Sequence, residues 1–160
     1  MVNPEMVMFE EELLQIQGIC ERLVRDANAA AVFIVDKNGQ LIAEAGETEH
    51  LDTTSLASLT AGNMAATGGI AKLLKENDFA TQFHEGQRRH MHIQVVGQRV
   101  ILVVVFDERS SLGLVRLRVR RASQEIDSVF EIMLSKVGEE PMTSPFAEIT
   151  DEDIDNLFND

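Results

Sequence analysis

The stretch at residues 31–46, AVFIVDKNGQLIAEAG, contains two strand-forming runs on either side of a turn sequence. Val, Ile and Phe favour half-buried pleated strands, so 31–36 predicts one strand and 40–45 the return strand, which Gly46 ends. Asn38-Gly39 supplies the two positive φ values that a tight hairpin turn requires. This stretch therefore predicts a β-hairpin, and the other predicted elements lie on either side of it.

Amphipathic helices are predicted before and after this hairpin. From about Glu5 to Asp26, apolar residues recur at the three- and four-residue steps of one helix face: Phe9, Leu13, Ile16, Cys20, Leu23 and Ala27. After the hairpin, Asp52 is a favourable N-cap for a helix that reaches about Glu76, and Leu51 is placed to staple its entry. The expected core contacts of this second helix are Leu56, Leu59, Ile70 and Leu74.

Three further strands and a final helix complete the predicted order. A short strand is expected around 82–86, followed by strands at 89–96 and 99–106 that a turn at Gly97-Gln98 joins. The last strand is almost continuously apolar, which indicates that both of its faces are covered. Ser110 or Ser111 caps a final helix with apolar residues at helical spacing: Leu112, Val115, Val119, Ala122, Ile126, Phe130, Met133 and Val137.

The order helix, two strands, helix, three strands, helix predicts an α+β fold. Its hairpins indicate one five-stranded antiparallel sheet with helices on its faces, an α-β-β-α-β-β-β-α sandwich. The chain has 160 residues, of which 44% are hydrophobic. This length and composition suit one compact domain with an appendage.

Charge and composition disfavour several classes of partner. The chain has 27 acids against 14 bases, a net charge of −13, and neither Trp nor Tyr. This balance disfavours nucleic acids and anionic membranes, because both are bound through Lys and Arg. The longest apolar run, 100–106, is too short to cross a bilayer. Cys20 is the only cysteine, which excludes an intrachain disulfide and indicates a reducing, cytoplasmic setting.

Composition changes at Gly138, after which the chain has eight acids and no base. We therefore assign 1–137 to the folded domain, 138–145 to a linker, and 146–160 to an acidic C-terminal motif. A helix in this motif would span about nine residues, below the ~12–15 that are stable alone in water. The motif is expected to fold on a partner's groove or, alternatively, to be a solubilising tail. Its apolar anchors are Phe146, Ile149, Ile154, Leu157 and Phe158.

The second predicted helix has an unusual number of small residues. Four of them recur at four-residue steps and define the small-residue stripe: Ala57, Ala61, Ala65 and Gly69. Gly62, Ala66 and Gly68 lie beside it, and each glycine inside a helix costs ~1 kcal/mol relative to alanine. Close approach of another backbone compensates this cost, either in docking to a second copy or another protein, or in packing under the chain's own sheet.

Other polar groups indicate no catalytic site. The last helix begins with a cluster of bases that is either a solvated face paired with acids such as Glu125 or a basic patch for an acidic partner surface or for the chain's own acidic tail: Arg109, Arg116, Arg118, Arg120 and Arg121. His90 and His92 share one strand face, with His84 expected nearby, and an exposed polar face explains them better than a metal site. The chain has no phosphate-binding glycine loop and no nucleophile elbow.

Five blocks of sequence carry a resemblance that covers nearly the whole length: VDKNGQLIAEAG (35–46), DTTSLASLTAGNMAATGGIAKLL (52–74), QFHEG (82–86), SSLGLVRLRVRRAS (110–123) and SPFAEITDEDIDNLF (144–158). Together they resemble the roadblock/dynein-light-chain family, and within it the MglB-type bacterial polarity regulators. The resemblance implies a roadblock fold and a homodimer whose middle helices pack side by side and whose two sheets join into one.

This resemblance implies a regulator rather than an enzyme. The implied partner is an MglA-type Ras-like small GTPase, whose GTP hydrolysis the regulator stimulates without supplying an arginine finger. It reshapes the switch region so that the GTPase's own Arg and Gln reach the nucleotide. No cofactor is implied, because GTP and Mg²⁺ bind to the GTPase. A cytoplasmic location is implied, and the polarity role is compatible with action at a cell pole.

By the same resemblance, the GTPase contacts Ala61, Ala65, Gly68 and Gly69 of the middle helix. Leu14, Gln15 and Arg121 are expected at the rim of this surface. The C-terminal motif is expected to grip a remote surface of the GTPase and to promote nucleotide exchange.

Two alternative functions stay open at this point. One is a roadblock scaffold that tethers a GTPase or a cytoskeletal partner without changing its turnover. The other is a metal- or ligand-binding enzyme that uses His84, His90 and His92.

Overall fold

A computed structural model describes residues 9–139 of the chain. Its helices are α2 (Glu10–Asp26), α3 (Thr53–Leu73) and α4 (Leu112–Glu139). Its strands are β1 (Ala31–Asp36), β2 (Leu41–Gly46), β3 (Thr81–Glu85), β4 (His90–Val96) and β5 (Val100–Phe106). The predicted order of elements is confirmed, and α4 continues two residues past the predicted domain end. Residues 140–160, with all five anchors of the C-terminal motif, lie outside the described residues.

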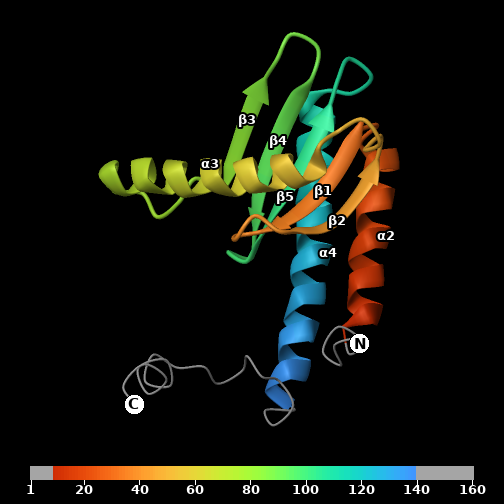
Figure 1. The fold of residues 1–160 in the computed structure, drawn as a ribbon, viewed down its shortest axis with the longest axis vertical. Coiled ribbons are helices and arrows are strands. Elements are labelled where there is room, and N and C mark those ends of the chain that lie inside the picture. The colour runs from red at the N-terminus through yellow and green to blue at the C-terminus, as the bar shows by residue number, and fades with distance from the viewer. Residues whose placement is uncertain (1–8, 140–160) are drawn as a thin grey trace.

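The five strands form one antiparallel sheet in the order β2-β1-β5-β4-β3. Helices α2 and α4 cover one face of this sheet, and α3 crosses the other (Figure 1). All seven residues of the central strand β5 are buried, which confirms the coverage expected from its apolar sequence. In the described part of the chain, no helix is both long and apolar enough to cross a membrane.

The turn between β1 and β2 differs from the prediction. Gly39 has a φ of 90°, but Asn38 is not among the residues with positive φ. The Asp36 carboxylate stabilises the turn by accepting hydrogen bonds from the Asn38 and Gln40 backbone N–H groups, both at 2.9 Å. Two consecutive positive φ values occur instead in the turn between β4 and β5, where Gly97 and Gln98 both have a φ of 59°.

The hydrophobic cores on the two faces of the sheet differ in size. Between the sheet and the helices α2 and α4 lies the larger core, which contains Ile16, Cys20, Leu23, Val119 and Ile126. On the opposite face, α3 contributes only Ala57 to the fully buried cluster, with Leu56 and Met64 partly buried against it. The face of the sheet under α3 is therefore thinly covered within one chain.

Four residues of the α3 segment, Leu56, Leu59, Ile70 and Leu74, are predicted to contact the core, and the prediction is wrong for three of them. Leu59, Ile70 and Leu74 are 71%, 51% and 62% exposed, and only Leu56 packs against the sheet. Ile70 and Leu74 are exposed because α3 crosses the sheet obliquely and its C-terminal part extends beyond the edge strand β3, where the described residues offer no surface to cover it (Figure 1). Leu59 lies between the buried Ala57 and Ala61, and is exposed because it is on the side of the helix that faces away from the sheet.

Candidate partner-binding surface

The small-residue stripe of α3 is divided between the core and the surface. Asp52 caps the helix by accepting a hydrogen bond from the Ser55 backbone N–H at 3.1 Å. Ala57 is fully buried and Ala61 is 9% exposed, so the first half of the stripe packs on the chain's own sheet. Ala65 and Gly69 are exposed. The predicted docking role is therefore available to the second half of the stripe, whereas Ala61 has a packing role.

The fold itself does not require two of the glycines in α3. A Cβ built on Gly62 or on Gly69 meets no other atom within 4 Å. Beside Gly68, the nearest atom is the Asp78 Oδ1, at 3.4 Å, which is an ordinary contact distance. Alanine would therefore fit in the same space and favour the helix by ~1 kcal/mol. The free space beside Gly69 gives another molecule room to approach the α3 backbone closely.

A hollow of about 400 Å³ lies beside the exposed half of the stripe. Val95 and Ile101 form its apolar floor, and Lys37 and Lys72 bring positive charge to its lining. Its other lining residues come from α3 and the loop that follows it: Ala61, Met64, Ala65, Gly68, Gly69, Asn77 and Asp78. The surface therefore combines a shallow, side-chain-poor helix with an apolar recess, which suits contact with a protein.

Gln82 of β3 fixes the position of α3 over the sheet. Its Nε2 donates a hydrogen bond to the Thr67 Oγ1 at 2.7 Å, and its Oε1 accepts one from the Asn63 Nδ2 at 2.8 Å. Gln82 is not among the residues that the sequence predicts for this surface. Its role follows from the strand register. Gln82 pairs with Ile93 of β4, so both side chains lie on the α3 side of the sheet.

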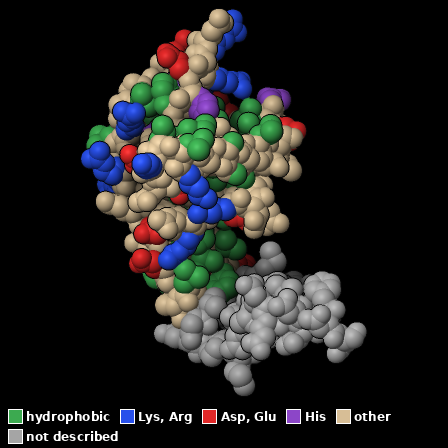
Figure 2. All heavy atoms as spheres, turned by 90° about the vertical axis from the view of Figure 1, so that its left-hand side faces the viewer, with side chains coloured by type: hydrophobic (Ala, Val, Ile, Leu, Met, Phe, Trp, Pro, Cys, Tyr) green, Lys and Arg blue, Asp and Glu red, His purple; other side chains and the backbone are tan. Residues whose placement is uncertain are grey.

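Beyond the edge of the sheet, α3 exposes large apolar side chains. Ile70, Leu73 and Leu74 are 51%, 85% and 62% exposed. We call Ile70, Leu73 and Leu74 the α3 overhang. Figure 2 views the molecule from the side on which α3 extends beyond β3, and shows hydrophobic side chains gathered near the centre of that face. Large apolar side chains clustered at a surface mark an interaction site.

The other predicted contact residues lie in the opposite layer. Leu14 is 66% exposed on α2, and Gln15 is exposed beside it. Arg121 lies on α4, where its Nε is 3.4 Å from the Glu125 Oε1. Because the sheet separates α2 and α4 from α3, the expectation that these residues rim the Ala65–Gly69 surface does not hold within one chain.

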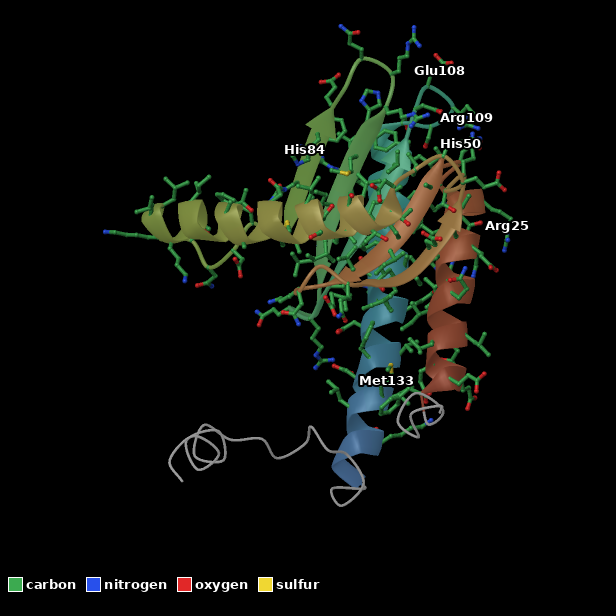
Figure 3. The ribbon with its side chains drawn as sticks, viewed as in Figure 1. Arg25, His50, His84, Glu108, Arg109 and Met133 are labelled. Carbon is green, nitrogen blue, oxygen red and sulfur yellow. The ribbon has the colours of Figure 1, made fainter. Side chains whose placement is uncertain are left out.

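Arg109 forms a polar cluster at one end of the sheet (Figure 3). Its guanidinium donates to both carboxylate oxygens of Glu47, at 2.9 and 3.0 Å, and to the Asp107 Oδ2 at 2.8 Å. The hydrogen bonds from the Arg109 side chain and backbone to Asp107 lower the pKa of Asp107 to about 2. For Arg109 and Arg121, pairing with local acids is therefore confirmed.

The three strand histidines do not converge. The register of β3 and β4 places His84 opposite Met91, on the α3 side of the sheet, whereas His90 and His92 face α4. The exposed polar face expected for them is wrong for His92, which is 1% exposed under α4. Among residues 9–139, no three His, Cys, Asp or Glu side chains lie close enough to hold a metal ion.

Cys20 is buried in the larger core, as expected. Burial raises the pKa of its thiol to about 12, so it is protonated and unreactive at neutral pH.

Comparisons with known proteins agree with this geometry. The family model of the Roadblock/LC7 domain matches residues 16–106. Comparison with curated proteins gives no match. Among solved structures, MglB of Myxococcus xanthus is 59% identical with a TM-score of 0.75, over 77% of this chain and 92% of that one.

Two further solved structures are similar over most of their length. A structure titled "MglB with tetrameric arrangement" is 30% identical with a TM-score of 0.73, over 76% of this chain and 92% of that one. The gliding protein MglB of Thermus thermophilus is 31% identical with a TM-score of 0.68, over 76% and 90% of the two chains. The chain belongs to the Roadblock/LC7 family, and within it resembles the MglB proteins.

Proposed function

We propose that the protein is a homodimeric activator of GTP hydrolysis by an MglA-type Ras-like GTPase that controls bacterial polarity or motility. The observation that carries this proposal is the exposed part of the small-residue stripe. Ala65 and Gly69 present a helix surface with almost no side chains, and the fold does not need the glycine there. Similarity to MglB proteins supports the choice of an MglA-type partner.

The α3 overhang supports the dimer. Its apolar side chains extend past β3, which is an outer strand that pairs only with β4 within the described residues. In a two-fold dimer, each overhang would cover the thinly covered sheet face of the other chain, and the two β3 edges would extend one sheet into the next. Sedimentation equilibrium should give twice the 17.8 kDa of one chain, and a mass of 17.8 kDa alone would contradict the dimer.

The activator would supply position rather than a catalytic group. Phosphoryl transfer depends on orientation and on stabilisation of charge, so reshaping the GTPase switch region is sufficient to raise the rate. Helix α3 contains no arginine, and the cations that line its hollow are the lysines Lys37 and Lys72. This composition agrees with hydrolysis that uses the GTPase's own Arg and Gln. The C-terminal motif, with Phe146 and Phe158, would bind a second surface of the GTPase and promote exchange.

A single-turnover assay of GTP hydrolysis by the cognate GTPase, with and without this protein, tests the proposal. We expect the protein to raise the rate about tenfold or more, which corresponds to ~1.4 kcal/mol or more of barrier lowering. Binding without any change in the rate would contradict activation and would identify the protein as a roadblock scaffold. Hydrolysis by this protein without the GTPase would contradict its role as a regulator.

A further inference from the structure

A second hollow, of about 500 Å³, lies on the opposite side of the sheet from the small-residue stripe. Strands β3 and β4 form its floor and α4 forms its wall, so it takes no part in the surface proposed for the GTPase. Its lining residues are Thr81, His92, Gln94, Arg116, Val119, Arg120, Ser123 and Gln124. Seven of these eight side chains are polar or positively charged, and none is a carboxylate.

Two polar groups of this hollow have no hydrogen-bond partner within the described residues. They are the His92 Nδ1 and the Ser123 Oγ, both of which are buried atoms. The His92 residue is 1% exposed, and burial together with the charge of Arg116 lowers its pKa. Both atoms are enclosed by the surrounding protein, so the donors that the hollow itself presents to a ligand come first from the exposed side chains of Arg116 and Arg120.

The positive charge of the hollow is not paired with an acid among residues 9–139. Arg116 and Arg120 lie one turn apart on α4, and neither forms an ion pair with a residue in 9–139. By contrast, Arg22, Arg109 and Arg121 all pair with carboxylates. Like charges four residues apart on a helix repel each other, so an anion held between the two guanidinium groups would offset that repulsion.

We propose that this hollow binds a small oxyanion of the phosphate class, either inorganic phosphate or the phosphoryl group of a small metabolite. Arginine forks and hydroxyl groups are the donors that bind phosphate oxygens, and Arg116, Arg120 and Ser123 supply them from a single helix. Thr81 and Gln94 are joined by a hydrogen bond of 2.9 Å and add further polar groups at the floor. The volume is that of a small-molecule site.

Isothermal titration of the full-length protein with inorganic phosphate, and separately with AMP, tests this site. We expect saturable binding of at least one of the two, and the tighter ligand distinguishes free phosphate from a phosphorylated metabolite. Arg116→Gln and Ser123→Ala should each weaken binding, Arg116→Gln by about tenfold, because one charge-assisted hydrogen bond is lost. The matched control is Arg99→Gln in the exposed turn between β4 and β5, which should leave binding unchanged.

The NMR signals of the histidine imidazoles give a second readout. If the residues of the hollow had a structural role only, these signals would not change when the ligand is added. Addition of the ligand should shift the signals of His92 and leave those of the exposed His50 and His84 unchanged. Absence of saturable binding at millimolar ligand, or equal weakening by Arg99→Gln, would overturn the proposal. Tighter binding of a polyglutamate peptide than of phosphate or AMP would also overturn it, because the hollow would then belong to an acidic protein surface.

Discussion

Glu12 is a carboxylate held in the interior between two helices. Its side chain is 3% exposed on α2, and Lys136 of α4 donates a hydrogen bond to its Oε1. This hydrogen bond lowers the pKa of Glu12, although burial opposes the shift. A buried charge is tolerated where a partner compensates it, so this pair links the N-terminal part of α2 to the C-terminal part of α4.

Removing either member of this pair should have unequal effects. Lys136→Met leaves the buried Glu12 charge without a partner, and should lower the melting temperature more than Glu12→Gln, which removes the charge itself. Lys37→Met, in an exposed turn, is the matched control and should change stability little. Melting followed by far-UV circular dichroism measures all three variants. An equal loss in Lys136→Met and Lys37→Met would contradict the role of the pair.

The same pair predicts how stability changes with pH. Because the pKa of Glu12 is lower in the folded state than its ordinary value of 4.5, its contribution to stability is fully present above pH 4.5. It is lost as the pH falls through the lower, folded-state pKa. Urea denaturation at neutral pH and at acid pH values below 4.5 should show a smaller acid loss for Glu12→Gln than for the natural protein. An equal acid loss in both proteins would contradict this contribution.

Helix α3 combines a regular start with a sequence that its own fold does not explain. The Asp52 cap and the buried Ala57 fix its first half on the sheet. Gly69 in its second half, like Gly62 near its middle, is at a position where a Cβ would meet nothing within 4 Å. We interpret this as a helix whose C-terminal half is shaped by contacts with other molecules and whose N-terminal half is shaped by the core.

Gly69→Ala should therefore stabilise the protein. The substitution removes backbone freedom from the unfolded chain and fills open space, so we expect ~0.5–1 kcal/mol more free energy of unfolding. Urea denaturation followed by circular dichroism measures it, since the chain lacks Trp and Tyr. Gly97→Ala is the contrasting variant and should destabilise, because Gly97 has a φ of 59° and a Cβ there would contact Asp127 too closely. A loss of stability in Gly69→Ala would contradict this account.

Local sequence patterns predict where helices and strands lie along the chain, and they predict less well which of their side chains are buried. Capping residues and apolar spacing locate α3 and α4, because these signals depend on neighbours within a few positions. The exposure of Ile70 and Leu74 depends on where the sheet ends beneath α3, which no local pattern records. His92 looks like an exposed strand residue in the sequence and is buried because α4 packs over β4.

At the level of the whole molecule, one face of the sheet forms the main core and the other forms the proposed binding surface. The face under α2 and α4 holds the larger core, and the face under α3 has a hollow of about 400 Å³ and an overhanging helix. The sequence predicted Ala65 and Gly69 as an accessible surface, which the fold confirms. The family resemblance also places Leu14, Gln15 and Arg121 at the rim of this surface, but the sheet lies between the two sets of residues. A resemblance between sequences identifies contact residues and does not show on which side of the sheet each one lies.

The most direct test of the account is the hydrolysis assay repeated with variants of the small-residue stripe. Ala65→Arg and Gly69→Arg add a long, charged side chain to the exposed surface of α3, and should return GTP hydrolysis to the rate of the GTPase alone. Gly69→Ala, and Leu117→Arg on the exposed side of α4, should keep the stimulation. Circular dichroism confirms that each variant is folded. Full stimulation by folded Ala65→Arg and Gly69→Arg would contradict the claim that this surface binds the GTPase.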